Sequence, residues 1–305
     1  MWLCYYSLIM SEILTNSKKG KVIAIVGATA SGKTAFSIEL AKKLDGEIVS
    51  ADSRLVYKGF DIGTAKPTVE EMDGVPHHLI DIVEPEFEYS AGLYKKQATE
   101  VISQILSRGN VPIICGGTGL YIDILLKNYD LPEIEANREL RDELMGLDTP
   151  ILENILKKID IEAFLTIDKN DRKKMIRAIE IIKATGKPLS QTRGVGSAVY
   201  EVEWIGKNFD RKTLYERIDK RVDIMIDNGL VEETKKLLEK HGRIPNLVNT
   251  IGYREILGYI DNLCSLDEAA ELLKKNTRNY AKRQLTWFRR NEEIKWDIYP
   301  EKLKK

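Results

Sequence analysis

The sequence has few of the residues that build disulfide frameworks, metal clusters or membrane spans. Only three cysteines occur in 305 residues, and Cys4, Cys115 and Cys264 are far apart. The absence of any C-x-x-C pair excludes a disulfide framework and argues against a zinc site. No apolar run approaches the roughly 18 residues that a membrane span needs. We therefore expect a cytoplasmic protein that does not bind a membrane.

The chain also has a formal net charge of zero, because 47 Lys and Arg residues balance 47 Asp and Glu residues. Overall charge therefore indicates no polyanionic partner, although charges can still be segregated along the chain. A hydrophobic fraction of 43% suffices for one large domain or two modest ones. Residues 1–20 lack the basic start and cleavage site of a signal peptide. We expect them to be a disordered leader outside the fold.

One stretch fits G-x-x-x-x-G-K-[ST], the phosphate-binding P-loop pattern. Its residues are Gly27, Ala28, Thr29, Ala30, Ser31, Gly32, Lys33 and Thr34. An apolar run at Val22–Val26 predicts a strand before it, and Ala35–Leu44 predicts a helix after it. The loop N–H groups and the helix dipole favour an anion. Lys33 would contact a terminal phosphate, and Thr34 would help hold Mg²⁺. The pattern indicates a polyphosphate or diphosphate without fixing the reaction.

Two further strands end in residues that could act on a substrate. Glu47–Ala51 precedes Asp52, and Val111–Cys115 leads into the glycine turn Gly116–Gly119. Parallel strands gather their carboxyl ends at the ligand-binding edge of a sheet. Asp52 is thus a candidate general base or indirect Mg²⁺ partner, with helix capping as the alternative. Thr118 could bind substrate, or the turn could be an ordinary connection. Alternating strands and helices predict a doubly wound parallel α/β sheet.

The histidine pair His77 and His78 falls on another short predicted strand, His77–Asp81. Adjacent residues of a strand point to opposite faces, so the pair does not form a metal site. We expect both histidines to be structural or to support a site without binding its ligand directly.

The chain changes character over residues 131–199, which are charged and helical in pattern without a strand signal. We predict a helical insertion there, between a P-loop core at 21–130 and 200–305. Thr149-Pro150 predicts a helix start with Thr149 as the N-cap, and Asp171–Lys187 carries six basic residues against two acids. Lys274–Arg290 carries seven basic residues and no acid, with aromatic residues between them. Such a mixture suits nucleic acid, but core aromatics under a solvated basic face would give the same pattern.

Together these motifs resemble the tRNA dimethylallyltransferase (MiaA) family over about residues 21–298. Besides the P-loop, the resemblance rests on Ser50–Arg54, Asp61–Pro67, His77–Asp81, Gly116–Tyr121, Gly252-Tyr253 and Thr277–Arg289. Several such blocks in order are more specific than the P-loop alone.

The resemblance implies transfer of a dimethylallyl group from dimethylallyl diphosphate to N6 of adenosine 37, in tRNAs that read codons starting with U. The P-loop would then bind a prenyl diphosphate rather than act as an ATP site. By match to the family, Asp52 is the base, and Lys33, Thr34 and Thr118 complete the catalytic set. Arg217 and Arg221 resemble cations beside the diphosphate. The tRNA-binding residues implied are Asp52, Ser53, Arg54, Leu55, Thr118, Arg141, Arg172, Arg177, Asn249, Gly252, Tyr253, Arg254 and Arg283.

The resemblance further implies a P-loop-type fold, a Mg²⁺ cofactor and a bacterial-type enzyme, because the zinc finger of eukaryotic members is missing. We expect a monomer. Three alternatives remain at this point: a P-loop kinase of a small metabolite, an adenylate isopentenyltransferase, and an RNA-binding module without activity.

Overall fold

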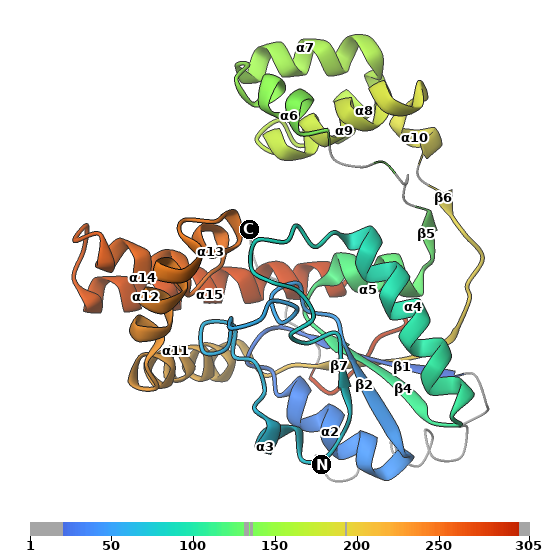
Figure 1. Cartoon of the computed structure of the whole chain (residues 1–305). Helices are drawn as coiled ribbons and strands as arrows, with labels where there is room; N and C mark the ends of the chain where they lie inside the picture. The colour runs from blue at the N-terminus through green and yellow to red at the C-terminus, as the bar shows by residue number, and fades with distance from the viewer. Residues whose placement is uncertain (1–20, 131–133, 135–136, 193, 299–305) are drawn as a thin grey trace. The chain divides into compact units, whose positions relative to one another are not determined.

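The computed structural model describes residues 21–130, 134, 137–192 and 194–298. The chain divides into two compact units (Figure 1). Among the described residues, unit 1 contains 21–122 and 200–298, and unit 2 contains those between 123 and 199. The division begins inside a helix, before the predicted insertion boundary at residue 131. The leader predicted at residues 1–20 lies outside the described residues.

Unit 1 is built on a six-stranded sheet in which every pairing is parallel, in the order β3-β2-β4-β1-β7-β8. The strands are β1 (Lys21–Gly27), β2 (Gly46–Ser50), β3 (His77–His78), β4 (Val111–Gly116), β7 (Glu201–Lys207) and β8 (Lys295–Trp296). The parallel α/β fold predicted from the sequence is confirmed. β7 follows the insertion and pairs with β1 along its whole length, from Lys21 opposite Glu201 to Gly27 opposite Lys207.

Helices cover both faces of this sheet because its strands are apolar on both sides. Ile23 and Ile25 of β1 pack with Phe36 and Leu40 of α2 (Lys33–Leu44) in one buried cluster. Alternate residues of a strand face opposite sides, so Val22, Ala24 and Val26 point the other way, and all are fully buried. α4 (Ala91–Ser107) contacts β2 and β4, and the C-terminal helix α15 (Leu266–Phe288) contacts β1.

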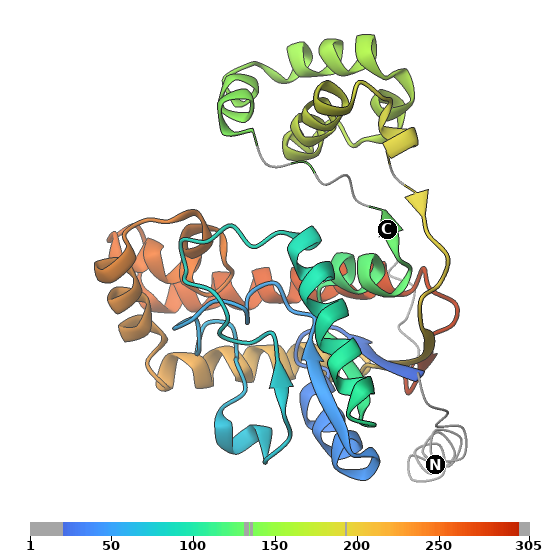
Figure 2. The ribbon, with the colours of Figure 1, turned by 45° about the vertical axis from the view of Figure 1, so that its right-hand side comes forward.

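The rest of unit 1 consists of short connections and a group of helices after β7 (Figure 2). α3 (Val69–Met72) and α5 (Gly119–Leu126) connect strands. The later helices are α11 (Arg211–Asp227), α12 (Leu230–His241), α13 (Pro245–Asn249), α14 (Tyr253–Ile260) and α15 (Leu266–Phe288). α11 and α15 pack against the P-loop, because Ala28 and Ala30 share a buried cluster with Leu214, Ile218 and Ala281. The loop is thus enclosed by helices from the far end of the chain.

Unit 2 is a helical unit with its own core. Its helices are α6 (Arg138–Met145), α7 (Thr149–Ile159), α8 (Ile161–Thr166), α9 (Arg172–Thr185) and α10 (Leu189–Thr192). Met175 and Ile179 of α9 are fully buried and pack with Leu152 and Leu156 of α7. A short antiparallel ribbon of β5 (Tyr129–Asp130) and β6 (Gly194–Val195) also belongs to this unit. The prediction that no strand interrupts residues 131–199 is therefore wrong at β6.

Two other local predictions are corrected. The helix predicted to be capped by Thr149 is capped by Asp148, so that Thr149 is its first residue. The strand predicted at His77–Asp81 ends at His78, because Leu79 and Asp81 have positive φ values of 62° and 54°. No helix of the described residues has the length and apolar character needed to cross a membrane.

Candidate active site

The P-loop joins β1 to α2 through a tight turn that depends on glycine. Gly32 is the N-cap residue of α2 with φ of 81°, and Ala30 also lies in the left-handed region with φ of 61°. A Cβ atom on Gly27 would lie 2.1 Å from the backbone oxygen of Lys207 in the neighbouring strand. Only glycine fits there, because real Cβ contacts are never this short. The turn therefore places its N–H groups at the N-terminus of a 12-residue helix.

Lys33 lies beside this turn as a poorly solvated cation. Its Nζ donates to the Ala28 carbonyl at 2.5 Å. Burial lowers the pKa of Lys33 to about 8, with Arg221 lowering it further and Cys115 and Asp52 opposing this. Its charge is thus destabilised in the folded protein, and a bound anion would stabilise the charged form.

Asp52 and Thr118 come together at the carboxyl ends of β2 and β4. The Thr118 N–H donates to the Ala51 carbonyl at 3.1 Å, and the Ser53 N–H donates to Thr118 Oγ1 at 3.0 Å. The Arg54 N–H donates to Asp52 Oδ1 at 2.8 Å, which fixes the carboxylate on its turn. Asp52, Ser53, Arg54, Leu55 and Thr118 are all partly exposed. Because Asp52 also acts on the pKa of Lys33, these strand ends and the P-loop form one site.

Gln284 of α15 joins the two glycine turns, and the sequence prediction did not include it. Its Oε1 accepts from the Thr29 N–H at 2.8 Å, and its Nε2 donates to the Gly117 carbonyl at 2.9 Å. The residue is 5% exposed. A Cβ atom on Gly117 would lie 2.1 Å from Nε2, so the bridge requires glycine at that position. In the sequence, Gln284 is marked only by being an amide within a basic helix.

The arginines predicted to lie beside the diphosphate do contact the P-loop. Arg217 Nε donates to the Ala30 carbonyl at 2.9 Å, and Arg221 Nη1 donates to Thr29 Oγ1 at 3.4 Å. Burial, with Arg217 as the second cause, lowers the pKa of Arg221. α11 therefore places two more cations at the anion-binding turn. Their contact with a diphosphate stays a prediction.

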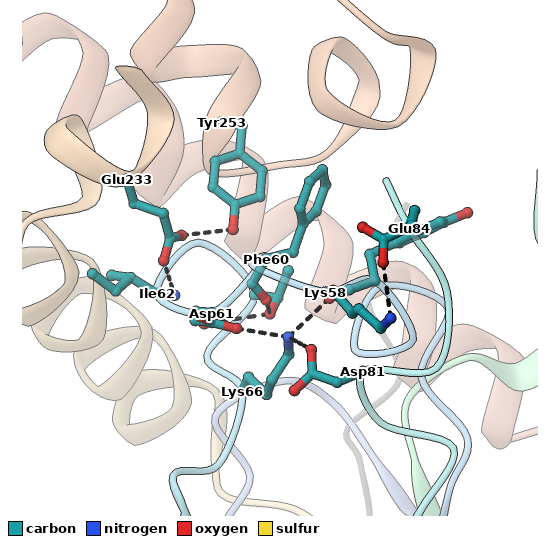
Figure 3. Close-up of polar contacts among 11 residues, drawn as sticks. Lys58, Phe60, Asp61, Ile62, Lys66, Asp81, Glu84, Glu233 and Tyr253 are labelled. Carbon is teal, nitrogen blue, oxygen red and sulfur yellow. Dashed lines mark hydrogen bonds and ion pairs between the residues drawn. The ribbon is translucent and has the colours of Figure 1, made fainter. Parts of the chain in front are cut away.

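A second polar network lies on the connection between β2 and β3 (Figure 3). Lys66 has a side chain only 5% exposed and contacts both Asp61 and Asp81. Glu233 of α12 accepts from the Ile62 N–H and from the Tyr253 hydroxyl. Lys58 and Glu84 form a more exposed pair nearby. This network fixes the loop 61–67 against α12 and α14.

The four predicted tRNA-binding residues near α14 differ in exposure. Asn249 and Arg254 are exposed, and Arg254 pairs with the buried Glu255 at 2.6 Å. Gly252 and Tyr253 are buried, and Tyr253 is 0% exposed. The prediction of direct tRNA contact is therefore corrected for the Tyr253 side chain, which lies inside the protein and donates to Glu233.

The aromatic residues of the basic C-terminal helix are packing residues. Phe288 is 3% exposed, and the Trp287 ring would lie 2.3 Å from a Cβ atom on Gly119. Burial raises the pKa of Tyr280, whose hydroxyl bonds with Thr118. Arg283 is exposed, with its guanidinium 5.8 Å from the Tyr280 ring. The interpretation of these aromatics as a surface for unstacked bases is wrong for Phe288, which is buried, whereas Trp287 packs on Gly119 and stays partly exposed.

The basic residues of unit 2 also have structural partners. Arg141 and Arg177 both contact Glu180, whose side chain is 1% exposed. Burial alone would raise the pKa of Glu180, but hydrogen bonds from the two arginines lower it below its ordinary value. Arg172 donates to Thr149 Oγ1 at 2.8 Å and to the Leu147 carbonyl at 2.6 Å. Any contact of these three arginines with tRNA stays a prediction.

The P-loop offers one protein ligand, the Thr34 hydroxyl, to the predicted Mg²⁺. Thr34 is exposed in the first turn of α2. Among the described residues, no three His, Cys, Asp or Glu side chains are grouped to hold a metal ion. This donor set fits Mg²⁺, which keeps several waters and binds through few protein ligands and substrate phosphates. Cys115 and Cys264 are free thiols.

Comparisons with known proteins give one consistent result. The family model IPP transferase matches residues 55–291, and the model isopentenyl transferase matches residues 20–84. A tRNA dimethylallyltransferase of Pelotomaculum thermopropionicum is 44% identical over 289 residues, covering 92% of each chain. One from Carboxydothermus hydrogenoformans is 46% identical over 293 residues, covering 93% of this chain and 94% of its own.

Solved structures show the same similarity. A full-length tRNA isopentenylpyrophosphate transferase from Bacillus halodurans has 43% identity and a TM-score of 0.69, covering 92% of this chain and 89% of its own. A eukaryotic dimethylallyltransferase solved while acting on tRNA has 32% identity and a TM-score of 0.78, covering 88% of this chain and 70% of its own.

Proposed function

The chain belongs to the IPP transferase family, and we propose that it transfers the dimethylallyl group of dimethylallyl diphosphate to N6 of adenosine 37 in tRNAs reading codons that begin with U. The predicted family and the predicted enzyme class, a tRNA prenyltransferase, are confirmed. The observation that carries the proposal is the meeting of Lys33, Asp52 and Thr118 at neighbouring strand ends. An anion site next to a carboxylate suits a reaction in which diphosphate leaves and a proton is removed at the same place.

The proposed reaction replaces a carbon–oxygen bond with a carbon–nitrogen bond and moves one proton. The N6 nitrogen of the adenine attacks the first carbon of the dimethylallyl group, and the bond from that carbon to the diphosphate oxygen breaks. Asp52 takes the proton that N6 loses, because an exocyclic amine is a weak nucleophile that needs a base. The Arg54 N–H holds one oxygen of Asp52, leaving the carboxylate aimed from a fixed turn. Diphosphate leaves with both electrons of the broken bond.

The leaving diphosphate requires positive charge at the P-loop. Lys33, Arg217 and Arg221 contact or adjoin this loop, and its N–H groups add their dipoles. Thr34 would hold Mg²⁺ together with the diphosphate oxygens, and the bound ion would neutralise charge that develops on them. A diphosphate beside Lys33 also raises the pKa of its ammonium, which keeps it charged during the reaction.

The adenosine of a tRNA loop must leave its stack before Asp52 can reach N6. Thr118 would contact the extruded base. Around it in unit 1, we propose that tRNA contacts the exposed Arg254 and Arg283 and the turn Asp52–Leu55. The arginines of unit 2 would contact the anticodon stem. We propose that the enzyme acts as a monomer.

The test is transfer of label from radioactive dimethylallyl diphosphate. We expect incorporation into unmodified tRNA with adenosine at position 37, and none into the same tRNA with guanosine there. Nuclease digestion and chromatography should return the label as N6-prenylated adenosine. Equal labelling of the guanosine variant, or no labelling of either tRNA, contradicts the proposal.

A second candidate is prenyl transfer to adenosine monophosphate. It is favoured by the match of the isopentenyl transferase model to residues 20–84, which contain the P-loop and Asp52. The same assay separates the two, since adenosine monophosphate replaces tRNA as acceptor. Label in the nucleotide and not in tRNA would establish the second candidate.

A further inference from the structure

The segment Asn249–Arg254 contains the proposed tRNA contact Arg254. One carboxylate inside the protein holds this segment in place. Glu233 of α12 accepts three hydrogen bonds. Its Oε2 accepts from the Ile62 N–H at 2.8 Å, and its Oε1 accepts from the Gly63 N–H at 3.0 Å and from the Tyr253 hydroxyl at 2.7 Å. The carboxylate thus joins the loop 61–67 to the first residue of α14 (Figure 3).

The two backbones joined by Glu233 are in direct contact. A Cβ atom on Gly63 would lie 2.5 Å from ring carbons of Tyr253, and one on Gly252 would lie 2.9 Å from the Gly63 oxygen. The Phe60 and Tyr253 rings meet edge to face with centroids 4.7 Å apart. The loop and the start of α14 are therefore closely packed, with the Glu233 carboxylate bonded to both.

The same loop is connected to the turn that carries Asp52. The Lys66 ammonium donates to the Tyr57 carbonyl at 2.8 Å and to Asp61 at 2.7 Å, and it also contacts Asp81. On the other side, Arg54 Nη1 donates to Asn246 Oδ1 of α13 at 3.2 Å. The residues after Asp52 are therefore connected to the loop 61–67 through Tyr57 and Lys66, and to α13, which leads into the segment 249–254, through Arg54 and Asn246.

From this arrangement we infer that Glu233 is a positioning residue for the tRNA substrate. It is not one of the residues proposed to touch RNA. The inference rests on the proposed function. Glu233 holds Gly63 and Tyr253 through hydrogen bonds. In this way it keeps Asn249 and Arg254 at a set place relative to the Asp52 turn. It contributes nothing to the P-loop, so the diphosphate site is independent of it.

The test compares two ligands in three variants. Glu233→Gln keeps the shape but replaces one acceptor oxygen with an amide, so a buried donor loses its partner. We expect the Kd for unmodified tRNA to rise about tenfold, and the Kd for inorganic diphosphate with Mg²⁺ to stay within about twofold. In turnover, KM for tRNA should rise while kcat at saturating tRNA is retained. Glu232→Gln is the matched control, because it removes the same charge from an exposed neighbour on the same helix.

Tyr253→Phe provides a milder variant that removes only the hydroxyl and should weaken tRNA binding by less than Glu233→Gln. If Glu233→Gln does not fold, this variant decides the question alone. Unchanged tRNA binding in the variants that fold overturns the inference, and so does a parallel loss of tRNA and diphosphate binding, which a general structural role would give. Because binding is measured without turnover, a wild-type chain that binds tRNA but transfers no label contradicts the proposed function only. A wild-type chain that binds no tRNA overturns both.

Discussion

Replacing Lys33 with methionine should abolish diphosphate binding and at the same time stabilise the folded protein. The Lys33 ammonium is poorly solvated in the folded protein, and its proposed role is to bind the diphosphate. Lowering its pKa from 10.5 to about 8 corresponds to roughly 3 kcal/mol of destabilisation of the charged form. Loss of its hydrogen bond to the Ala28 carbonyl should offset about 1 kcal/mol of this. Lys33→Met should therefore be about 2 kcal/mol more stable than the wild type at pH 7.

The pH dependence has a definite sign. The folded pKa of Lys33 lies below its unfolded value of 10.5, so the unfolded chain binds more protons between pH 8 and that value. Wild-type stability should rise with pH across this window relative to the variant, and the penalty is complete below about pH 8. The advantage of Lys33→Met should therefore shrink as the pH is raised from 8 to 10.

Urea unfolding at several pH values, with and without inorganic diphosphate and Mg²⁺, measures both effects. At a ligand concentration about 100 times its Kd, diphosphate should stabilise the wild type by about 2.7 kcal/mol and the variant by none. Lys43→Met is the control, because Lys43 forms an exposed pair with Glu39 on the same helix. Such pairs contribute little, so this change should alter stability by less than about 0.5 kcal/mol. Equal diphosphate stabilisation of Lys33→Met and wild type would refute the reasoning.

Three further predictions concern buried polar side chains. Gln284→Leu leaves one buried acceptor and one buried donor of the glycine turns unpaired, and urea unfolding should show a loss of roughly 2–4 kcal/mol together with a lower kcat. Glu180→Gln should cost roughly 1.5–3 kcal/mol in unit 2, seen as faster amide exchange in α9 while exchange in α2 is unchanged. At Glu47, burial favours a higher pKa, but hydrogen bonds from Arg108, Asn110 and His78 lower it to about 2. Its contribution of roughly 3 kcal/mol is present above pH 4.5 and lost as the pH falls toward 2, and Glu47→Gln should remove this acid sensitivity from the unfolding curve.

The features that could be predicted from the sequence are those fixed by neighbouring residues. The P-loop, its strand and its helix are one continuous segment, so the pattern of residues 27–34 carries its own context. Asp52 and Thr118 could be assigned to the same edge because parallel strands place their ends together. These predictions need no knowledge of which distant segment covers the site.

The features that could not be predicted depend on contacts between distant segments. Gln284 reaches Thr29 across 255 positions, and Glu233 reaches Ile62 across 171. Nothing local distinguishes either side chain from an exposed polar residue of a helix. The aromatics of α15 show the same difficulty, because their spacing suits a helix face that packs on glycine turns as well as one that stacks on bases. The observed burial of Phe288 decides between the two interpretations for that residue.

The most direct test of the central claim is the single-turnover rate of Asp52→Asn with tRNA and dimethylallyl diphosphate already bound. Asparagine keeps the oxygen that accepts from the Arg54 N–H, so the turn should retain its geometry. If Asp52 removes the proton from N6, the rate at saturating tRNA should fall roughly 10²–10⁴-fold while the Kd for diphosphate is unchanged. A rate within about threefold of the wild type would contradict the assignment of Asp52 as the base.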